Sequence, residues 1–215
     1  MKFVSIAFAA AFMAAPAVAA DTIAYNSTPA DGWFYGSGND YSPANTTVLT
    51  TGNGDQMYMR FHRTFEQAPA SVGNVYSFAL GTNPLSFDWG IDNNAGALIS
   101  ALLTLTNVGT GQSVSYDPFI SIGNATGNGS TQNSFRFNFI PGLFDPNVDN
   151  TYRVDMSVSG LGGGGTRDLS ILAQFGAGAA PAVPEPSTWA MLILGFFAMG
   201  ATIRNRRTRT TVSYA

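Results

Sequence analysis

Few side chains in this sequence could carry out chemistry, and their types limit the reactions that are open. The chain of 215 residues contains one histidine, His62, and no cysteine. A cysteine nucleophile and a zinc site built from several histidines are therefore excluded. His62 shares a polar face with Tyr58 and Arg60 in an alternating segment, residues 57–65, so we expect a surface or edge histidine. A serine nucleophile would need His62 as its base, but no Gly-x-Ser-x-Gly turn accompanies it.

A pair of acidic residues raises the question of glycoside hydrolysis. Asp88 and Asp92 flank a Trp-Gly-Ile tripeptide, and glycosidases use two carboxylates. Acids on either side of a glycine are also common in loops. We therefore predict no catalytic residues and no enzyme activity.

A second acidic cluster resembles the start of a calcium loop. Asp145, Asn147 and Asp149 stand at alternate positions, as the first ligands of such a loop do. An EF-hand then needs a glycine and a glutamate where this chain has Asn150 and Met156, which excludes an EF-hand. An irregular calcium site is still compatible with these residues, so calcium is the one candidate cofactor. The alternative is an Asx-rich turn before Tyr152.

The segment from Asp31 to Pro43 concentrates aromatic residues among glycine, serine, asparagine and aspartate. Trp33, Tyr35 and Tyr41 are candidate glycan contacts, since exposed rings can stack on the apolar face of a sugar. The alternative, which we favour, is that the rings close one end of the core, because aromatic residues bury large areas.

Period-two alternation of apolar and polar residues predicts the fold class. The clearest expected strands cover residues 57–65, 75–80, 103–106, 114–116, 135–139, 152–158 and 169–175, and a glycine-rich turn covers 160–165. Most of them have one apolar and one polar face, as antiparallel sheets with one wet side require. We predict an all-β protein with an antiparallel β-sandwich over residues 21–176, with a jelly roll as one variant.

Charge restricts the partners of this domain. Residues 21–183 contain 12 acidic side chains, five arginines and no lysine, so their net charge is −7. Such a domain repels polyanions at long range, and we expect no nucleic acid partner. Without cysteine, the domain must be held by its core or by bound ions.

Both ends of the chain look like export signals. Lys2, an uncharged Ala- and Phe-rich run and a small-x-small site predict a signal peptide over residues 1–20. Near the other end, the uncharged residues 186–203 would form a helix about 27 Å long, close to the bilayer core of about 30 Å. Four arginines follow as a membrane-stop cluster: Arg204, Arg206, Arg207 and Arg209. We predict a Gly/Ala/Pro linker at 177–186, a transmembrane helix at 187–203 and a basic cytoplasmic tail at 204–215.

The end of the chain resembles that of PEP-CTERM proteins, which combine a Pro-Glu-Pro motif, a short apolar helix and terminal arginines. The residues that match the PEPxxWA form are Pro184, Glu185, Pro186, Trp189 and Ala190. The resemblance implies a sorting signal recognised by the membrane enzyme exosortase. It also implies Sec export, transient anchoring in the inner membrane with the domain outside, and release to the cell surface or extracellular matrix, typically together with exopolysaccharide.

We therefore expect an exported structural or adhesive protein of the cell surface or biofilm matrix, with exosortase and exopolysaccharide as partners. A carbohydrate-binding module is the first alternative. A polysaccharide-degrading enzyme is the second.

Overall fold

The computed structural model describes residues 19–30, 42–121, 124–127 and 129–178, and residues 193, 195–197, 199, 200 and 213 nearer the C-terminus. The chain divides into two units, Met1–Ala179 and Ala180–Ala215. Several features expected from the sequence lie outside the described residues: the signal peptide up to residue 18, the sorting-motif residues 184–190, the four membrane-stop arginines, and Trp33, Tyr35 and Tyr41.

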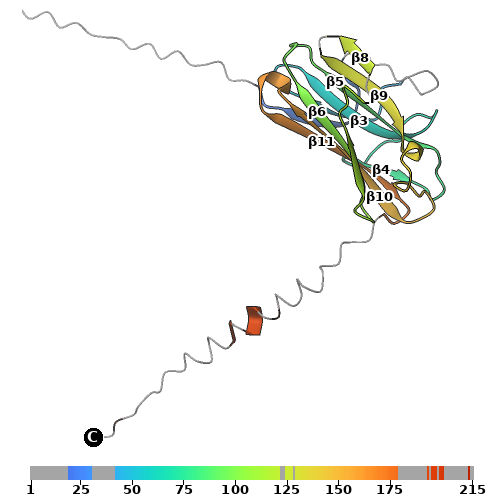
Figure 1. The fold of residues 1–215 in the computed structure, drawn as a ribbon, viewed down its shortest axis with the longest axis vertical. Helices are drawn as coiled ribbons and strands as arrows, with labels where there is room; N and C mark the ends of the chain where they lie inside the picture. Colours follow the sequence, from blue (N-terminus) through green and yellow to red (C-terminus); the bar gives the residue numbers. More distant parts are fainter. Residues whose placement is uncertain are drawn as a thin grey trace, which may run out of the picture. The chain divides into compact units, whose positions relative to one another are not determined.

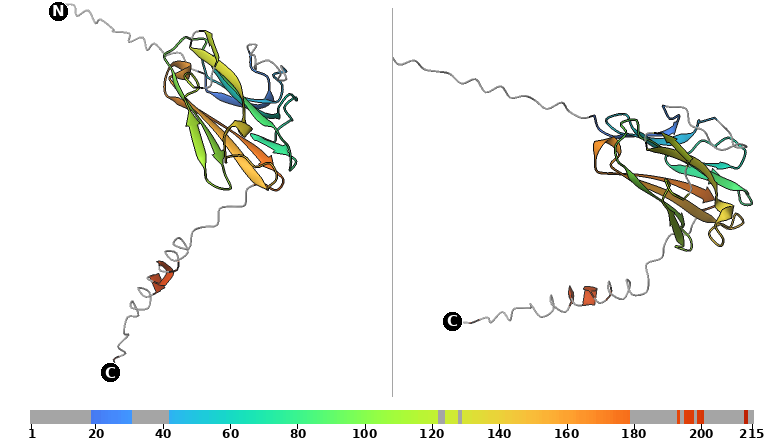
Figure 2. Two further views of the ribbon diagram at one scale, coloured as in Figure 1. Left: turned by 45° about the vertical axis from the view of Figure 1, so that its right-hand side comes forward. Right: turned by 45° about the horizontal axis from the view of Figure 1, so that its top comes forward.

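Two β-sheets pack face to face in the first unit (Figure 1). The first sheet has six strands in the order β1-β2-β3-β5-β9-β8, and the second has five in the order β4-β11-β10-β6-β7. Paired strands run antiparallel, except that β4 and β11 run parallel. Figure 2 shows the sheets as two layers. The predicted all-β sandwich is confirmed.

The elements of this unit follow the chain in a simple order. They are β1 (Thr22–Ser27), β2 (Thr46–Thr50), β3 (Gln56–Arg63), β4 (Val75–Phe78), β5 (Leu85–Asp92), β6 (Ser100–Asn107), β7 (Ser113–Tyr116), β8 (Asn124–Gly127), β9 (Ser130–Arg136), η1 (Phe137–Phe139), β10 (Asn150–Ser159), η2 (Leu161–Gly163) and β11 (Thr166–Phe175). Five pairs of consecutive strands are neighbours within one sheet, a hairpin arrangement. Greek keys also contain hairpin-connected strands, so the jelly-roll variant stays a prediction.

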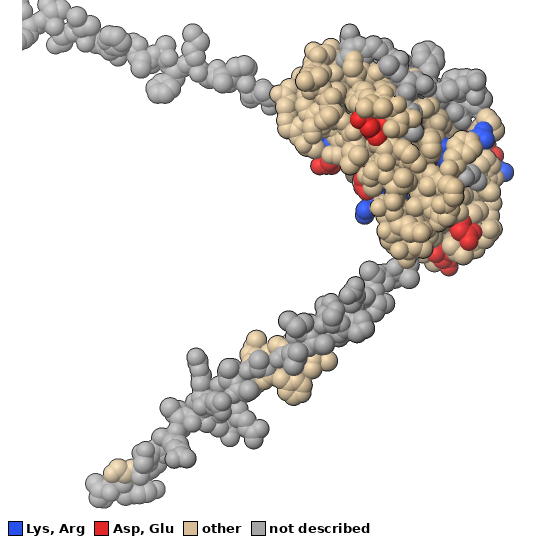
Figure 3. Space-filling view, viewed as in Figure 1, with Lys and Arg blue, Asp and Glu red and all other residues tan. Residues whose placement is uncertain are grey.

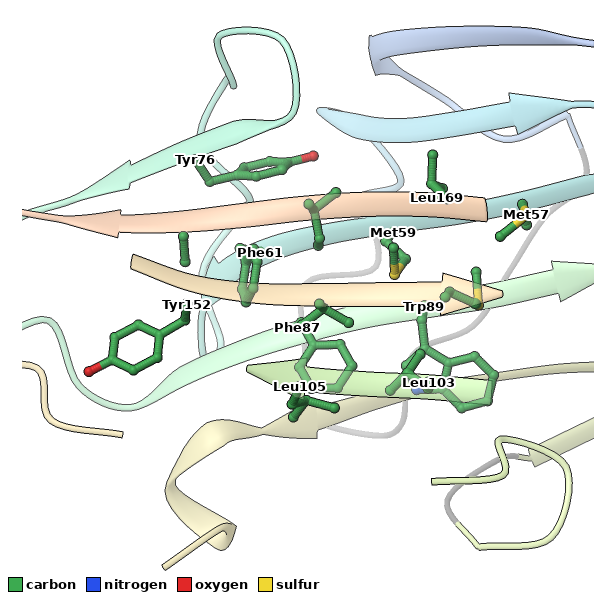
Figure 4. Close-up of a cluster of buried hydrophobic side chains, with 14 of the residues drawn as sticks. Met57, Met59, Phe61, Tyr76, Phe87, Trp89, Leu103, Leu105, Tyr152 and Leu169 are labelled. Atoms are coloured by element: carbon green, nitrogen blue, oxygen red, sulfur yellow. The ribbon is translucent and has the colours of Figure 1, made fainter. Parts of the chain in front are cut away.

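The core lies between the sheets and follows directly from the period-two pattern. In β10 the residues Tyr152, Val154, Met156 and Val158 are buried, while the polar residues between them are at most partly buried. The cluster drawn in Figure 4 joins residues of β3 and β5 in the first sheet to residues of β4, β6, β10 and β11 in the second. The alternation of apolar and polar residues along a strand therefore indicates which side chains face the opposite sheet.

The structure corrects the sequence-based prediction at Phe137–Phe139. We expected Phe135, Phe137 and Phe139 to alternate along one strand, but β9 ends at Arg136 and the next three residues form the 3₁₀ helix η1. Phe137 is buried, whereas Phe139 is 65% exposed. The sequence continues into Pro141 and Gly142, and the latter has a φ of 76°, so the chain turns away from the sheet here.

A central strand was also missed, because we had treated the segment around Asp88 and Asp92 as a loop. This segment is β5, which lies between β3 and β9. Its polar and glycine positions resemble a turn in sequence, but they alternate with Leu85, Phe87, Trp89 and Ile91, which all face the core. Strands β3 and β5 are buried on both faces along nearly their whole length.

The second unit contains a helical stretch. Residues 193, 195–197, 199 and 200 are helical, and the apolar side chains Ile193, Phe196, Phe197 and Met199 are each at least 50% exposed. Within the described part of the chain, no helix reaches the length and apolarity needed to span a bilayer. The expected transmembrane helix at 187–203 falls largely outside that part and stays a prediction.

A substitution on the outer face of β5 can test how closely the central strands pack. Gly90 lies opposite Tyr58 of β3, and a Cβ atom added at Gly90 would run into the Tyr58 ring. We expect Gly90→Ala to lower the free energy of unfolding by about 1–3 kcal/mol, measured by chemical denaturation, because the ring must move. In a Tyr58→Ala background the same change should cost much less. Equal costs in both backgrounds would contradict this contact.

The hydroxyl of Tyr76, in β4, links the second sheet to the segment that precedes β2 of the first sheet. This hydroxyl donates to the carbonyl oxygen of Asn45 at 2.8 Å, and the residue is fully buried. Burial raises the pKa of the Tyr76 hydroxyl above its ordinary value, although a hydrogen bond to Thr47 opposes this. The folded state thus holds this proton more tightly than the unfolded state. Its contribution to stability is complete below about pH 10 and is lost as the pH rises toward the folded-state pKa.

We therefore expect Tyr76→Phe to flatten the loss of stability above about pH 10, measured as the unfolding free energy against pH. At neutral pH the variant should be destabilised by about 1 kcal/mol, since the hydrogen bond to Asn45 is lost. The control is Tyr25→Phe, because Tyr25 is 47% exposed. An alkaline slope that is unchanged in Tyr76→Phe would refute the assignment.

Candidate functional site

The residues most able to do chemistry meet on the outer face of the first sheet. Asp88 of β5 accepts a hydrogen bond from Arg60 Nε at 2.7 Å through Oδ2, and its Oδ1 lies 3.1 Å from His62 Nε2. All three side chains are fully buried. This group, Arg60, His62 and Asp88, is called the charged triad below.

The strand register builds the charged triad. Arg60 lies directly opposite Asp88 in the β3–β5 ladder, and His62 lies opposite Ser86. Residues two apart in a strand point to the same face, so the carboxylate can reach the side chains of Arg60 and His62 at once. Ser86 Oγ is 2.6 Å from Thr64 Oγ1, which extends the polar contacts toward the end of β3.

Hydrogen-bond partners surround both ring nitrogens of His62. Its Nδ1 lies 2.8 Å from the carbonyl oxygen of Arg63 and 3.1 Å from that of Glu66. Carbonyl oxygens only accept, so Nδ1 must carry a proton, while Nε2 faces the Asp88 carboxylate. Both ring nitrogens of His62 are thus engaged, and the Asp88 carboxylate is shared between His62 and Arg60.

This arrangement binds segments of the chain together. A nucleophile needs a histidine nitrogen that can take its proton, but Nδ1 of His62 faces backbone carbonyls and Nε2 faces Asp88. Arg60 also donates from Nη1 to the carbonyl oxygens of Ser42 and Ala44, the latter at 3.1 Å. The charged triad thus ties β3 and β5 to the segments before β2 and after β3.

The structure corrects one sequence-based expectation here and separates the two acids of β5. His62 is fully buried on a central strand, not on a surface or edge, because the outer face of β3 is covered. Asp88 and Asp92 share the outer face of β5, but their surroundings differ. Asp88 is bound to the buried side chains of Arg60 and His62, whereas Asp92 is partly exposed and accepts from Asn94 Nδ2 at 2.9 Å.

The calcium candidates lie between η1 and β10. Asp145 Oδ1 accepts from the backbone amide of Asn147 at 2.9 Å and from its side-chain amide at 3.3 Å. Asp149 Oδ1 instead accepts from the backbone amide of Ala177 at 3.0 Å. The contacts at Asp145 are those of an Asx turn. Among the described residues, no group of three or more His, Asp or Glu side chains could hold a metal ion.

The charged triad makes a prediction about stability. Asp88→Ala should lower the free energy of unfolding by about 3–5 kcal/mol, because it leaves Arg60 buried without its counter-charge and removes the partner of His62 Nε2. The matched control is Asp155→Ala, which removes an exposed ion pair with Arg153 and should cost about 1 kcal/mol or less. Similar losses in both variants, measured by urea denaturation, would contradict the role of Asp88.

Comparison with known proteins identifies one part of the chain. No curated protein and no solved structure shows significant similarity to the chain. A family model described as the PEP-CTERM protein-sorting motif matches residues 182–207. This motif implies secretion, transient anchoring in the membrane and processing by exosortase. The chain is thus an exported protein that carries a PEP-CTERM protein-sorting motif at residues 182–207, consistent with a PEP-CTERM protein and exosortase substrate.

Proposed function

We propose that this chain is a non-enzymatic surface or matrix protein, released outside the cell and associated there with exopolysaccharide. In this role the β-sandwich is a structural or adhesive module that the sorting tail delivers. The observation that carries the proposal is the combination of a sorting motif at residues 182–207 with a β-sandwich whose most reactive side chains are engaged in packing.

The state of the charged triad supports a structural role for the domain. Arg60, His62 and Asp88 are the side chains best suited to acid–base chemistry, and they are fully buried and bound to one another. Groups that act on an external substrate must be able to reach it. Because the charged triad is buried, we expect the sandwich to act through its exposed surface and not through these three side chains.

The sequence of the tail supports release over permanent anchoring. The uncharged run before Arg204 covers 18 residues, near the lower limit for a transmembrane helix. This run begins at Pro186, the last residue of Pro184-Glu185-Pro186, which lies inside the matched motif. A permanent anchor has no need of this motif, whereas an enzyme that removes the tail needs a recognition sequence.

Mass spectrometry of the native protein tests this proposal. Protein from the cell surface or medium should lack peptides beyond about Trp189, while membrane-bound precursor should retain them. Replacing Pro184, Glu185 and Pro186 by alanine should retain the tail and keep the protein in the inner membrane. The matched control replaces Thr210 and Thr211, which lie outside the matched motif. Intact Arg204 to Ala215 on surface protein would leave an ordinary membrane anchor and refute release.

A further inference from the structure

An arginine at the end of β9 lies between two exposed aromatic rings. The Arg136 guanidinium carbon is 4.9 Å from the centre of the Phe65 ring and 5.8 Å from that of Phe139. Phe65 and Phe139 are 59% and 65% exposed, and Arg136 is partly exposed. The rings come from two different segments, the end of η1 and the turn after β3. This group, Arg136, Phe65 and Phe139, is called the aromatic–arginine site below.

Arg136 differs from the other arginines of the domain in its partners. Each of those is paired with an acid in the described structure: Arg60 with Asp88, Arg63 with Glu66, Arg153 with Asp155 and Arg167 with Asp21. In the described part of the chain, Arg136 contacts the two rings and no carboxylate. A guanidinium over a ring face can still donate hydrogen bonds in its own plane. A planar carboxylate is the ligand that matches this fork.

The backbone at Phe65 is held in an unfavourable conformation. Its φ is 68°, in the left-handed region that bulky residues rarely adopt. The turn is closed by a hydrogen bond from the Glu66 amide to the carbonyl oxygen of Arg63 at 2.9 Å, with an ion pair between the same two side chains. A strained backbone that presents an exposed apolar ring does not favour stability, and such strain gathers at binding sites.

The aromatic–arginine site rests on a rigid base. Arg136 lies opposite Ser86 of β5, whose hydroxyl contacts Thr64. The turn that carries Phe65 is also tied down, because His62 Nδ1 bonds to the carbonyl oxygens of Arg63 and Glu66. The charged triad thereby fixes one wall of the site. Charged side chains are sparse on the face of the sandwich shown in Figure 3.

We propose that the aromatic–arginine site binds carboxylate-bearing sugars, namely the uronic acid units of an acidic polysaccharide. The Arg136 fork takes the sugar carboxylate, and the apolar face of the pyranose ring lies against Phe65 or Phe139. An acidic peptide would supply the carboxylate but no rigid ring with an apolar face. The choice of a polysaccharide rests on the proposed function, whereas the preference for a carboxylate rests on Arg136 alone.

The domain charge of −7 opposes long-range attraction of a polyanion, so one site binds weakly. A polymer compensates for this weak binding, because its many equivalent units can contact many copies of the protein on a surface at once. Binding to a single site should weaken in salt, because it depends on an exposed ion pair.

Calorimetric titration of the full-length chain in detergent tests the site. The probe is an oligogalacturonate, compared with an uncharged glucan of the same length. Only the oligogalacturonate should bind. Arg136→Ala should weaken binding at least tenfold, and Arg136→Lys should weaken it severalfold because the fork is lost while the charge remains. Arg153→Ala is the matched control, since it removes the same charge from another exposed position and should leave binding unchanged.

Phe65→Gly separates a ligand-binding role from a structural one. Glycine relieves the positive φ, so the melting temperature should stay the same or rise while the Kd rises severalfold. Leu98→Ala, at a residue that is 98% exposed, controls for loss of an apolar side chain and should change neither quantity. The inference is overturned if the glucan binds equally, if Arg153→Ala weakens binding as much as Arg136→Ala, or if Phe65→Gly lowers the melting temperature without changing the Kd. None of these outcomes depends on whether the tail is removed, so the proposed release is judged separately.

Discussion

The Asp88 carboxylate is the contact on which the centre of the larger sheet depends. It pairs with Arg60 and contacts His62 at a place where all three side chains are fully buried. Charges without water are tolerated only when they are paired and hydrogen-bonded. Because Arg60 lies directly opposite Asp88, a register shift of one residue would turn the cation toward the apolar core. We infer that the pair specifies the alignment of β3 and β5 more than it adds net stability.

The same cluster determines the geometry of the neighbouring surface. His62 holds the turn from Arg63 to Glu66 through two carbonyl oxygens, and Phe65 projects from that turn. Arg136 reaches the Phe65 ring from β9, two strands away in the sheet from β3. A buried ionic contact and an exposed aromatic one are therefore parts of one structure. The buried part supplies the rigidity that a shallow binding surface needs.

A second buried carboxylate acts in a similar way elsewhere in the sandwich. Asp55 accepts from the backbone amides of Ala95 at 3.0 Å and Gly162 at 3.1 Å, which joins the turn before β3 to two loops that are distant in sequence. The chain has no cysteine with which to cross-link such loops. Hydrogen bonds from backbone amides to a buried carboxylate connect them instead, and each is strengthened by the charge of its acceptor.

The fold class, most strand positions and the sorting motif could be predicted from the sequence, because alternation and ordered short motifs are local properties of a chain. The sequence did not reveal β5, since polar and glycine residues on its outer face resemble a turn. It also misplaced His62, whose polar neighbours suggested an exposed face. The burial of the outer face of β3 and the contact between Arg136 and Phe65 follow from the pairing of strands that are distant in the sequence. Neither could be predicted from a local pattern. Burial and charge pairing depend on which strands become neighbours, and no local pattern records that choice.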